Sequence, residues 1–161
     1  MLELKPPVGG VIVIFGASGD LTRRRLVPAL YDLAHEGLLP SNTALVGCGR
    51  SQMTDASFRN YLRQSVGGFS HTQPVDEEAW GALERRTFYQ TCSYTDLDAY
   101  HRLRSRLEEL DGRFDTKGNR VFYLAVPPTV VEPVLHNLAA TGSLERRRAC
   151  DEEGACYLRV V

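Results

Sequence analysis

The sequence predicts an α/β fold in which a mostly parallel sheet carries helices on both faces. Residues 11–15 contain no polar side chain, which suits a strand that is covered on both faces. A glycine-rich turn follows at once, and a basic segment containing Leu26 then has the composition of a helix. A second apolar run over residues 43–48 completes the spacing of a βαβ unit. Together these observations indicate the doubly wound, Rossmann-like class.

The turn between the first strand and the first helix has the composition of a phosphate-binding loop. Gly16 and Gly19 can meet two needs, a sharp turn of the chain and a close approach of backbone N–H groups to a pyrophosphate. The helix that follows points its positive N-terminal end at the same place. The alternative is a purely structural turn, because similar turns join strands to helices in proteins that bind no cofactor. The βαβ context favours cofactor binding.

The middle of the chain is expected to form two helices and a strand. Thr54 or Asp55 can cap the first helix, which residues 67–68 end, and Asp76 can start the second. Apolar residues recur at helical spacing in both segments: Phe58, Tyr61, Leu62, Val66, Trp80 and Leu83. Residues 88–92 are then expected to form a strand.

The same alternation continues to the end of the chain. Thr95 and Asp98 form a capping box ahead of apolar residues at helical spacing, namely Leu97, Tyr100, Leu103, Leu107 and Leu110. A strand is expected over residues 120–126, a helix over residues 129–138 and a final strand over residues 156–161.

Length and composition are those of one globular domain over residues 1–161. Hydrophobic residues make up 43% and charged residues 24%, and the formal net charge is −1. This balance gives no reason to expect a nucleic acid or a membrane surface as partner. We find no apolar run of membrane-spanning length, and residues 1–7 lack the pattern of a secretory signal. We therefore expect a cytoplasmic protein.

The sequence shows no local metal site and no activated nucleophile. The cysteines and histidines have no Cys-x-x-Cys or His-x-x-x-His spacing: Cys48, Cys92, Cys150, Cys156, His35, His71, His101 and His136. Four cysteines could form two disulfides, but a domain of this size does not need them, so we expect free thiols. We expect neither a metal ion nor a cysteine nucleophile, since no visible cluster would lower a thiol pKa.

Five motifs occur along the chain at characteristic intervals. They are residues 16–21 (Gly-Ala-Ser-Gly-Asp-Leu) with three basic residues soon after, Leu26-Val27-Pro28, and residues 37–40, 46–51 and 122–129. In their order and spacing these motifs resemble the N-terminal, coenzyme-binding part of glucose-6-phosphate dehydrogenase. The resemblance implies that NADP is the cofactor and that the enzyme is a homo-oligomer. It also implies oxidation of glucose 6-phosphate to 6-phosphogluconolactone in the oxidative pentose phosphate pathway.

Members of that family continue, after a strand like residues 157–161, into motifs that this chain does not contain. These are Glu-Lys-Pro and Arg-Ile-Asp-His-Tyr-Leu-Gly-Lys, which bind the sugar phosphate and carry the general base. We therefore expect an NADP-binding domain without its substrate domain and assign no catalytic residue. Glucose 6-phosphate is expected as a partner of the full-length enzyme alone. Apolar surface exposed by the missing domain is expected to promote self-association.

The end of the second strand indicates which nicotinamide cofactor fits. NAD-binding domains usually place an acid there, which accepts hydrogen bonds from the ribose and repels the 2′-phosphate of NADP. Here Arg50 offers a planar guanidinium and Ser51 a hydroxyl, and no acid is present. The alternative is a surface arginine at a strand end. The resemblance implies 2′-phosphate contacts for Arg50, Ser51 and Ser18.

The resemblance also implies roles for the rest of the loop and for the far edge of the site. It assigns to the cofactor loop the run Gly16, Ala17, Ser18, Gly19, Asp20 and Leu21. From the residues alone, Asp20 can instead cap the helix, and Thr22 stands where Ala or Gly usually allows close packing. The fourth expected strand ends in Ala125, Val126, Pro127 and Pro128, which either border the nicotinamide or simply end the strand.

Two other classes of function are alternatives. Short-chain and epimerase-like reductases also begin with a Gly-x-x-Gly turn, but they need a Tyr-x-x-x-Lys pair, and no tyrosine here precedes a lysine by four residues. A noncatalytic NADP-binding or interaction module is the second alternative. The sequence favours the coenzyme-binding domain over both.

Overall fold

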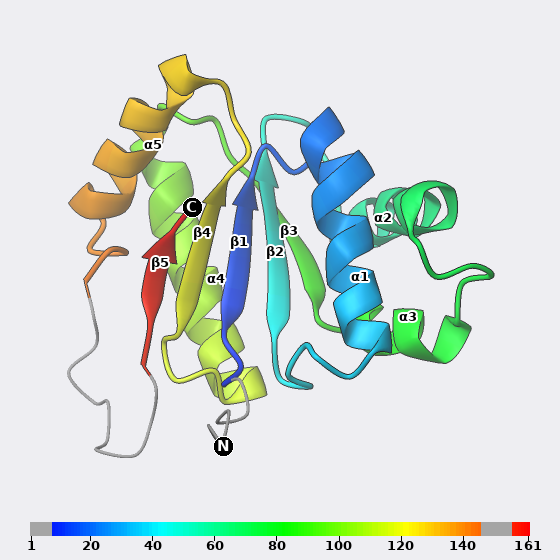
Figure 1. Ribbon diagram of the computed structural model, residues 1–161. Coiled ribbons are helices and arrows are strands. Elements are labelled where there is room, and N and C mark those ends of the chain that lie inside the picture. Colours follow the sequence, from blue (N-terminus) through cyan, green and yellow to red (C-terminus); the bar gives the residue numbers. More distant parts are fainter. Residues whose placement is uncertain (1–7, 146–155) are drawn as a thin grey trace, which may run out of the picture.

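A five-stranded, all-parallel sheet forms the centre of the computed structural model, which describes residues 8–145 and 156–161 (Figure 1). Its strands are β1 (Val11–Phe15), β2 (Ala44–Gly49), β3 (Thr87–Thr91), β4 (Arg120–Leu124) and β5 (Leu158–Val160). They are arranged in the order β3-β2-β1-β4-β5. The expected doubly wound, Rossmann-like α/β fold is confirmed.

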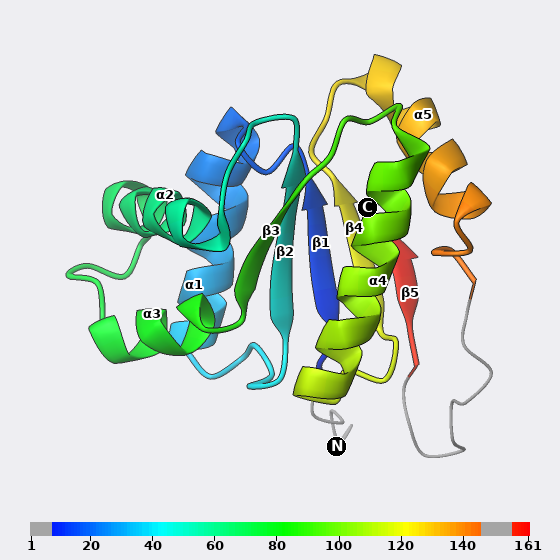
Figure 2. The same ribbon diagram turned by 180° about the vertical axis from the view of Figure 1, so that it is seen from behind.

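Helices cover both faces of this sheet, as Figures 1 and 2 show from opposite sides. They are the π-helix η1 (Thr22–Leu26) and the α-helices α1 (Val27–His35), α2 (Asp55–Phe69), α3 (Glu77–Glu84), α4 (Leu97–Phe114) and α5 (Pro128–Ala140). On one face Tyr31, Phe58 and Leu83, from α1, α2 and α3, pack with Leu45 of β2. On the other face, side chains of α4 and α5 pack against alternate residues of β1, β2 and β4.

The strand order reverses at β1, which positions the site. Phe15 at the end of β1 lies beside Cys48 of β2 on one side and beside Leu124 of β4 on the other. The connection after β1 leads to α1 on one face of the sheet and the connection after β4 leads to α5 on the other face, so a crevice opens between the carboxyl ends of β1 and β4. Doubly wound sheets bind ligands at such a point.

The helix boundaries differ from expectation at three places. The α2 helix begins after Thr54, whose side chain accepts from Ser57 N, but it continues through residues 67–68 to Phe69. The N-cap of α4 is Asp96 rather than Thr95. The α5 helix begins at Pro128, without a side-chain cap. In each case the helix itself was predicted, and only its end was misplaced.

The cysteines divide into two groups. Cys48 and Cys92 are free and buried, as expected, whereas the expectation of a free thiol is wrong for Cys156, which is disulfide-bonded. Cys150 lies outside the described residues. Over residues 8–145 and 156–161, no helix is long and apolar enough to cross a membrane, and no cluster of His, Cys, Asp or Glu could hold a metal ion.

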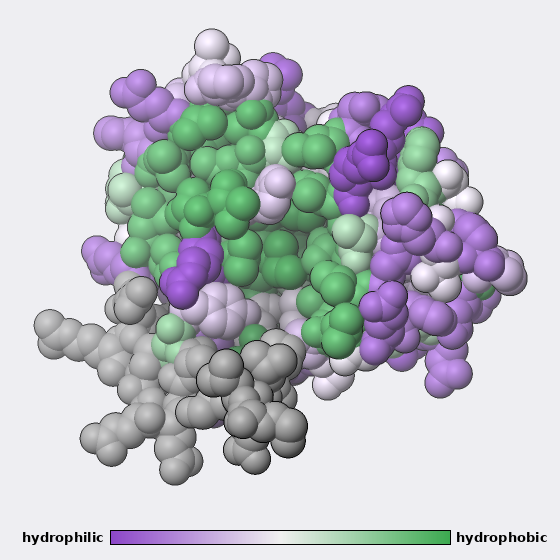
Figure 3. All heavy atoms as spheres, viewed as in Figure 1, coloured by the Kyte–Doolittle hydropathy of each residue, from purple (hydrophilic) through white to green (hydrophobic). Residues whose placement is uncertain are grey.

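One face of the molecule is markedly apolar. In Figure 3, hydrophobic side chains gather over α5, β4 and β1 in the view of Figure 1. Val160 and Val161, at the outer strand β5, are 43% and 61% exposed. This surface agrees with the exposed apolar area that we expected beside residues 157–161.

Candidate dinucleotide site

The glycine turn after β1 is built from backbone hydrogen bonds. The N–H groups of Gly16 and Ala17 both donate to the carbonyl of Cys48, at 3.0 and 3.1 Å, and Gly19 N–H donates to Gly16 O at 2.9 Å. Gly16 has φ +82°, and a Cβ there would lie 2.0 Å from Ala125 O. Glycine is therefore required at Gly16, both for its backbone conformation and for the close approach of the chain after β4.

The segment after the turn departs from an ordinary α-helix. Thr22, at the start of the π-helix η1, is fully buried, and its hydroxyl donates to Gly16 O at 3.0 Å. This hydrogen bond explains how a residue larger than Ala or Gly fits at the position. Asp20 does not cap the helix as expected: Leu21 is the N-cap, with no side-chain hydrogen bond, and Asp20 accepts from Arg24 Nε at 2.7 Å.

Two basic residues of η1 lie beside an aromatic ring of α2. The guanidinium groups of Arg23 and Arg24 lie 5.5 and 5.3 Å from the centroid of the Phe69 ring. Arg25 lines a different hollow, which lies beside α1. Neither Arg24 nor Arg25 lines the hollow that Gly16, Ser18 and Gly19 border.

Segments that follow β1, β2, β3 and β4 meet at the carboxyl edge of the sheet and line an open hollow of about 520 Å³. The loop after β1 contributes Gly16, Ser18 and Gly19, the loop after β2 contributes Arg50 and Ser51, and the segment after β4 contributes Ala125, Val126 and Pro127. Eight of the predicted site residues thus surround one space. Among the described residues lining it there is no Asp or Glu.

Four predicted residues do not line this hollow. Ala17 is fully buried and packs in the core, Asp20 is exposed, Leu21 is 47% exposed, and Pro128 is the exposed first residue of α5. The structure therefore brings together the two glycines, the two serines and Arg50, and leaves these four outside the lining.

Ser18 and Ser51 form the point where the β1 and β2 loops meet. Their hydroxyl oxygens lie 3.3 Å apart, although 33 positions separate the residues in the sequence. Arg50 lies beside them and is exposed. Two hydroxyls and a guanidinium in one place are donors suited to a phosphate group.

Two lining residues, Tyr94 and Val130, were not predicted. Tyr94 follows β3, and its ring centroid lies 5.9 Å from the Arg50 guanidinium carbon. Burial raises the pKa of Tyr94, and the charge of Arg50 offsets this in part. Parallel strands end at the same edge of the sheet, so a polar aromatic residue just beyond the third strand was a usable signal. Val130, near the start of α5, lines the hollow, whereas its neighbour Val131 does not.

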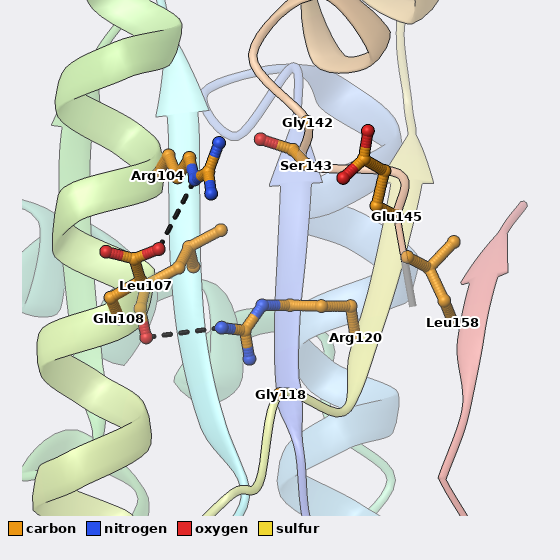
Figure 4. Close-up of a pocket in the computed structure, with 9 residues that line it drawn as sticks. All are labelled: Arg104, Leu107, Glu108, Gly118, Arg120, Gly142, Ser143, Glu145 and Leu158. Atoms are coloured by element: carbon orange, nitrogen blue, oxygen red, sulfur yellow. Dashed lines mark hydrogen bonds and ion pairs between the residues drawn. The ribbon is translucent and has the colours of Figure 1, made fainter. Parts of the chain in front are cut away.

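Another hollow, of about 200 Å³, lies between α4 and strands β4 and β5 (Figure 4). Arg104 contacts Glu108 there, and Arg120 Nη2 donates to the carbonyl of Leu107 at 3.3 Å. Arg120 also forms a buried ion pair with Asp111. The guanidinium groups of this hollow are therefore engaged within the protein. The hollow at the strand ends is the better candidate for an anionic ligand.

The parallel sheet, the glycine turn and a hollow at the carboxyl ends of β1, β2 and β4 define the class of Rossmann-like dinucleotide-binding domains. A family model agrees, since "Glucose-6-phosphate dehydrogenase, NAD binding domain" matches residues 13–152. The chain belongs to this family. The resemblance deduced from the five motifs is thereby confirmed.

Curated relatives and solved structures point the same way. Glucose-6-phosphate 1-dehydrogenase of Chlamydia muridarum is 44% identical over 128 residues, which are 80% of this chain and 25% of that protein. Glucose-6-phosphate 1-dehydrogenase 2 of Mycobacterium tuberculosis is 37% identical over 131 residues, 81% of this chain and 25% of that protein. The crystal structure of the Mycobacterium avium enzyme matches with TM-score 0.73 and 26% identity, over 85% of this chain and 28% of that one.

A solved glucose-6-phosphate dehydrogenase in complex with its substrate glucose-6-phosphate matches with TM-score 0.75 and 27% identity, covering 87% of this chain and 29% of that one. The chain thus spans about a quarter of the length of the curated relatives that it matches.

Proposed function

We propose that residues 1–161 are the NADP-binding domain of an enzyme that oxidises glucose 6-phosphate. The observation that carries this proposal is the meeting of the glycine turn with Arg50 and Ser51 around one hollow, with the Ser18 and Ser51 hydroxyls 3.3 Å apart. When bound, an oxidised nicotinamide dinucleotide accepts a hydride from the substrate. The domain's own residues bind and orient it.

The donor set supports NADP over NAD. Arg50, Ser51 and Ser18 provide a positive charge and two hydroxyls for the 2′-phosphate. NAD-binding domains usually have a ribose-binding acid at the end of the second strand, and no Asp or Glu is found among the described lining residues.

The remaining lining residues fit the other parts of a dinucleotide. The turn from Gly16 to Gly19 and the start of the helix after it form a site for the pyrophosphate. Ala125, Val126 and Pro127 follow β4 and border the hollow, and we assign them to the nicotinamide end.

The substrate assignment rests on the relatives. They are named glucose-6-phosphate 1-dehydrogenases, and a solved relative is described in complex with glucose-6-phosphate. This chain corresponds to the coenzyme-binding part of such proteins. We therefore assign cofactor binding to this domain and oxidation of glucose 6-phosphate to the whole protein.

The cofactor assignment can be tested by calorimetric titration of the purified chain with NADP and with NAD. Arg50→Ala removes a charge-assisted interaction of about 1.5–3 kcal/mol, so NADP affinity should fall roughly ten- to a hundredfold while NAD affinity changes little. Arg85→Ala is the matched control, because Arg85 is an exposed arginine at the end of α3 and does not line the hollow. An equal loss of affinity for both cofactors would refute the role of Arg50.

A further inference from the structure

Two tyrosines hold the two serines of the hollow through the backbone. Tyr61 of α2 donates its hydroxyl to Ser18 O at 3.1 Å, and Tyr89 of β3 donates its hydroxyl to Ser51 O at 2.8 Å. Each phenol thus reaches from a regular element to one of the two loops that meet at the hollow. Neither tyrosine lines the hollow itself.

The two phenol rings share one support. Phe58 of α2 lies with its ring centroid 4.9 Å from that of Tyr89 and 6.5 Å from that of Tyr61. Phe58 and Leu62 of α2 are 1% exposed, so this support belongs to the core. Two hydrogen bonds that begin from one packed aromatic cluster fix the Ser18 and Ser51 backbones relative to each other.

Further contacts hold Tyr89 in place. Its backbone N–H donates to the Asp55 carboxylate at 2.7 Å, and Asp55 is paired with Arg106 at 2.6 Å. The Tyr89 hydroxyl lies close to Gly49, and a Cβ added at Gly49 would be 2.9 Å from the hydroxyl oxygen. A glycine at the end of β2 therefore leaves the space that the phenol needs to reach Ser51.

Both phenols keep their protons at neutral pH. Burial raises the pKa of Tyr61, and burial raises the pKa of Tyr89 to about 12. Each therefore acts as a hydrogen-bond donor to a carbonyl, which is the role that the geometry requires.

We propose that Tyr61 and Tyr89 are positioning residues for the 2′-phosphate of NADP. By fixing the Ser18 and Ser51 backbones, they hold the two serine hydroxyls beside Arg50 so that all three donors can meet one phosphate without a cost of ordering the loops. This inference rests on the proposed function. It adds that discrimination between NADP and NAD depends on two side chains that do not touch the cofactor.

The test replaces each phenol by phenylalanine. Tyr61→Phe and Tyr89→Phe each remove one hydrogen bond and should weaken NADP binding about three- to tenfold in calorimetric titrations. Tyr89→Phe should leave NAD binding unchanged, and Tyr61→Phe should weaken NADP more than NAD, because Ser18 also belongs to the turn that we assign to the shared pyrophosphate. Tyr157→Phe is the matched control, because Tyr157 also donates its hydroxyl to a backbone carbonyl, that of Val8 at 3.0 Å, and does not line the hollow.

A double-mutant comparison of NADP affinity distinguishes a positioning role of the tyrosine from a purely structural one. If Tyr89 acts through Ser51, the double variant Tyr89→Phe/Ser51→Ala should lose less NADP affinity than the product of the fold losses of the two single variants. A double variant whose loss of NADP affinity equals that product would overturn the proposal, as would an equal loss of NADP and NAD affinity.

The outcomes separate this inference from the proposed function. If the unmodified chain binds neither cofactor, the proposed function fails and the positioning role fails with it. If the unmodified chain prefers NADP, Arg50→Ala removes that preference and both phenylalanine variants retain it, the positioning role alone is wrong. If Tyr89→Phe does not fold, Gly49→Ala tests the same step, since its Cβ would displace the Tyr89 hydroxyl, and unchanged NADP preference in that folded variant would contradict the proposal.

Discussion

Replacing Gly16 by alanine should destabilise the protein far more than the same change at Gly19. Gly16 has φ +82°, a conformation that costs a residue with a Cβ about 1–2 kcal/mol. The added Cβ would also lie 2.0 Å from Ala125 O, a backbone atom, so the chain after β4 has to move. Overpacking of this kind costs about 1–3 kcal/mol. The expected loss is therefore about 2–5 kcal/mol of unfolding free energy.

Gly19 provides the matched control within the same turn. Its backbone lies outside the left-handed region, and the nearest atom to an added Cβ is Gly16 O at 3.1 Å. Gly19→Ala should change the unfolding free energy by less than about 1 kcal/mol.

Urea unfolding followed by circular dichroism measures both variants, and the melting temperature provides a second readout. For a chain of this length, about 2–4 °C is lost per kcal/mol, so Gly16→Ala should melt about 4–20 °C below the unmodified chain. If Gly16→Ala were as stable as Gly19→Ala, the contact between the turn and the chain after β4 would not be as described.

Three other predictions concern binding, stability and assembly. Gly19→Val should fold and yet lose NADP binding, because its side chain stands between the turn and the pyrophosphate; undiminished affinity in calorimetry would make the turn merely structural. Asp111→Asn leaves the buried Arg120 guanidinium without its carboxylate partner and should lower the unfolding free energy, measured with urea, by about 3–5 kcal/mol; an unchanged free energy would show that the ion pair does not stabilise the fold. Through its exposed apolar face, the chain should self-associate in sedimentation velocity as concentration rises, whereas a monomer throughout would contradict this.

The Asp111 carboxylate also predicts a pH dependence. Burial opposes its ionisation, but hydrogen bonds from Arg120 and Thr116 outweigh burial and hold the pKa of Asp111 below its ordinary value of 3.8. The ionised carboxylate therefore stabilises the folded state above that value, and this contribution is lost as the pH falls below it. Asp111→Asn should accordingly flatten the loss of stability in acid.

Catalysis by this chain alone is not expected. The described residues lining the hollow offer no carboxylate or imidazole to take a proton from a sugar hydroxyl. Purified chain with glucose 6-phosphate and NADP should form no NADPH by absorbance. Turnover like that of a complete dehydrogenase, with contaminating enzyme excluded, would require a base that the structure does not indicate.

Local patterns predicted the parts of the fold that depend on neighbours in sequence. The strand β1 has its predicted bounds, Val11–Phe15, because a strand buried on both faces is apolar throughout. Helix ends were less predictable, since Thr95 and Asp96 can both cap a helix and tertiary contacts decide between them. The α2 helix continues past its glycines to Phe69, whose ring lies beside Arg23 and Arg24 of η1, a contact that only the folded chain reveals.

Part of the candidate site could also be predicted from the sequence, and part could not. Gly16, Gly19 and Arg50 were predictable because the glycine turn and the end of the second strand have fixed places in a βαβ unit. The supports of the site were not, since Tyr61 reaches Ser18 across 43 positions. No local pattern specifies such a contact, because it depends on how α2 packs against the sheet.

The most direct test of the account is a crystal structure of this chain grown with NADP. The account predicts the dinucleotide in the hollow at the carboxyl ends of β1, β2 and β4, its pyrophosphate on the turn from Gly16 to Gly19 and its 2′-phosphate within hydrogen-bond distance of Arg50, Ser51 and Ser18. A dinucleotide bound elsewhere, for example in the hollow beside Arg104, or a 2′-phosphate directed away from Arg50, would contradict it.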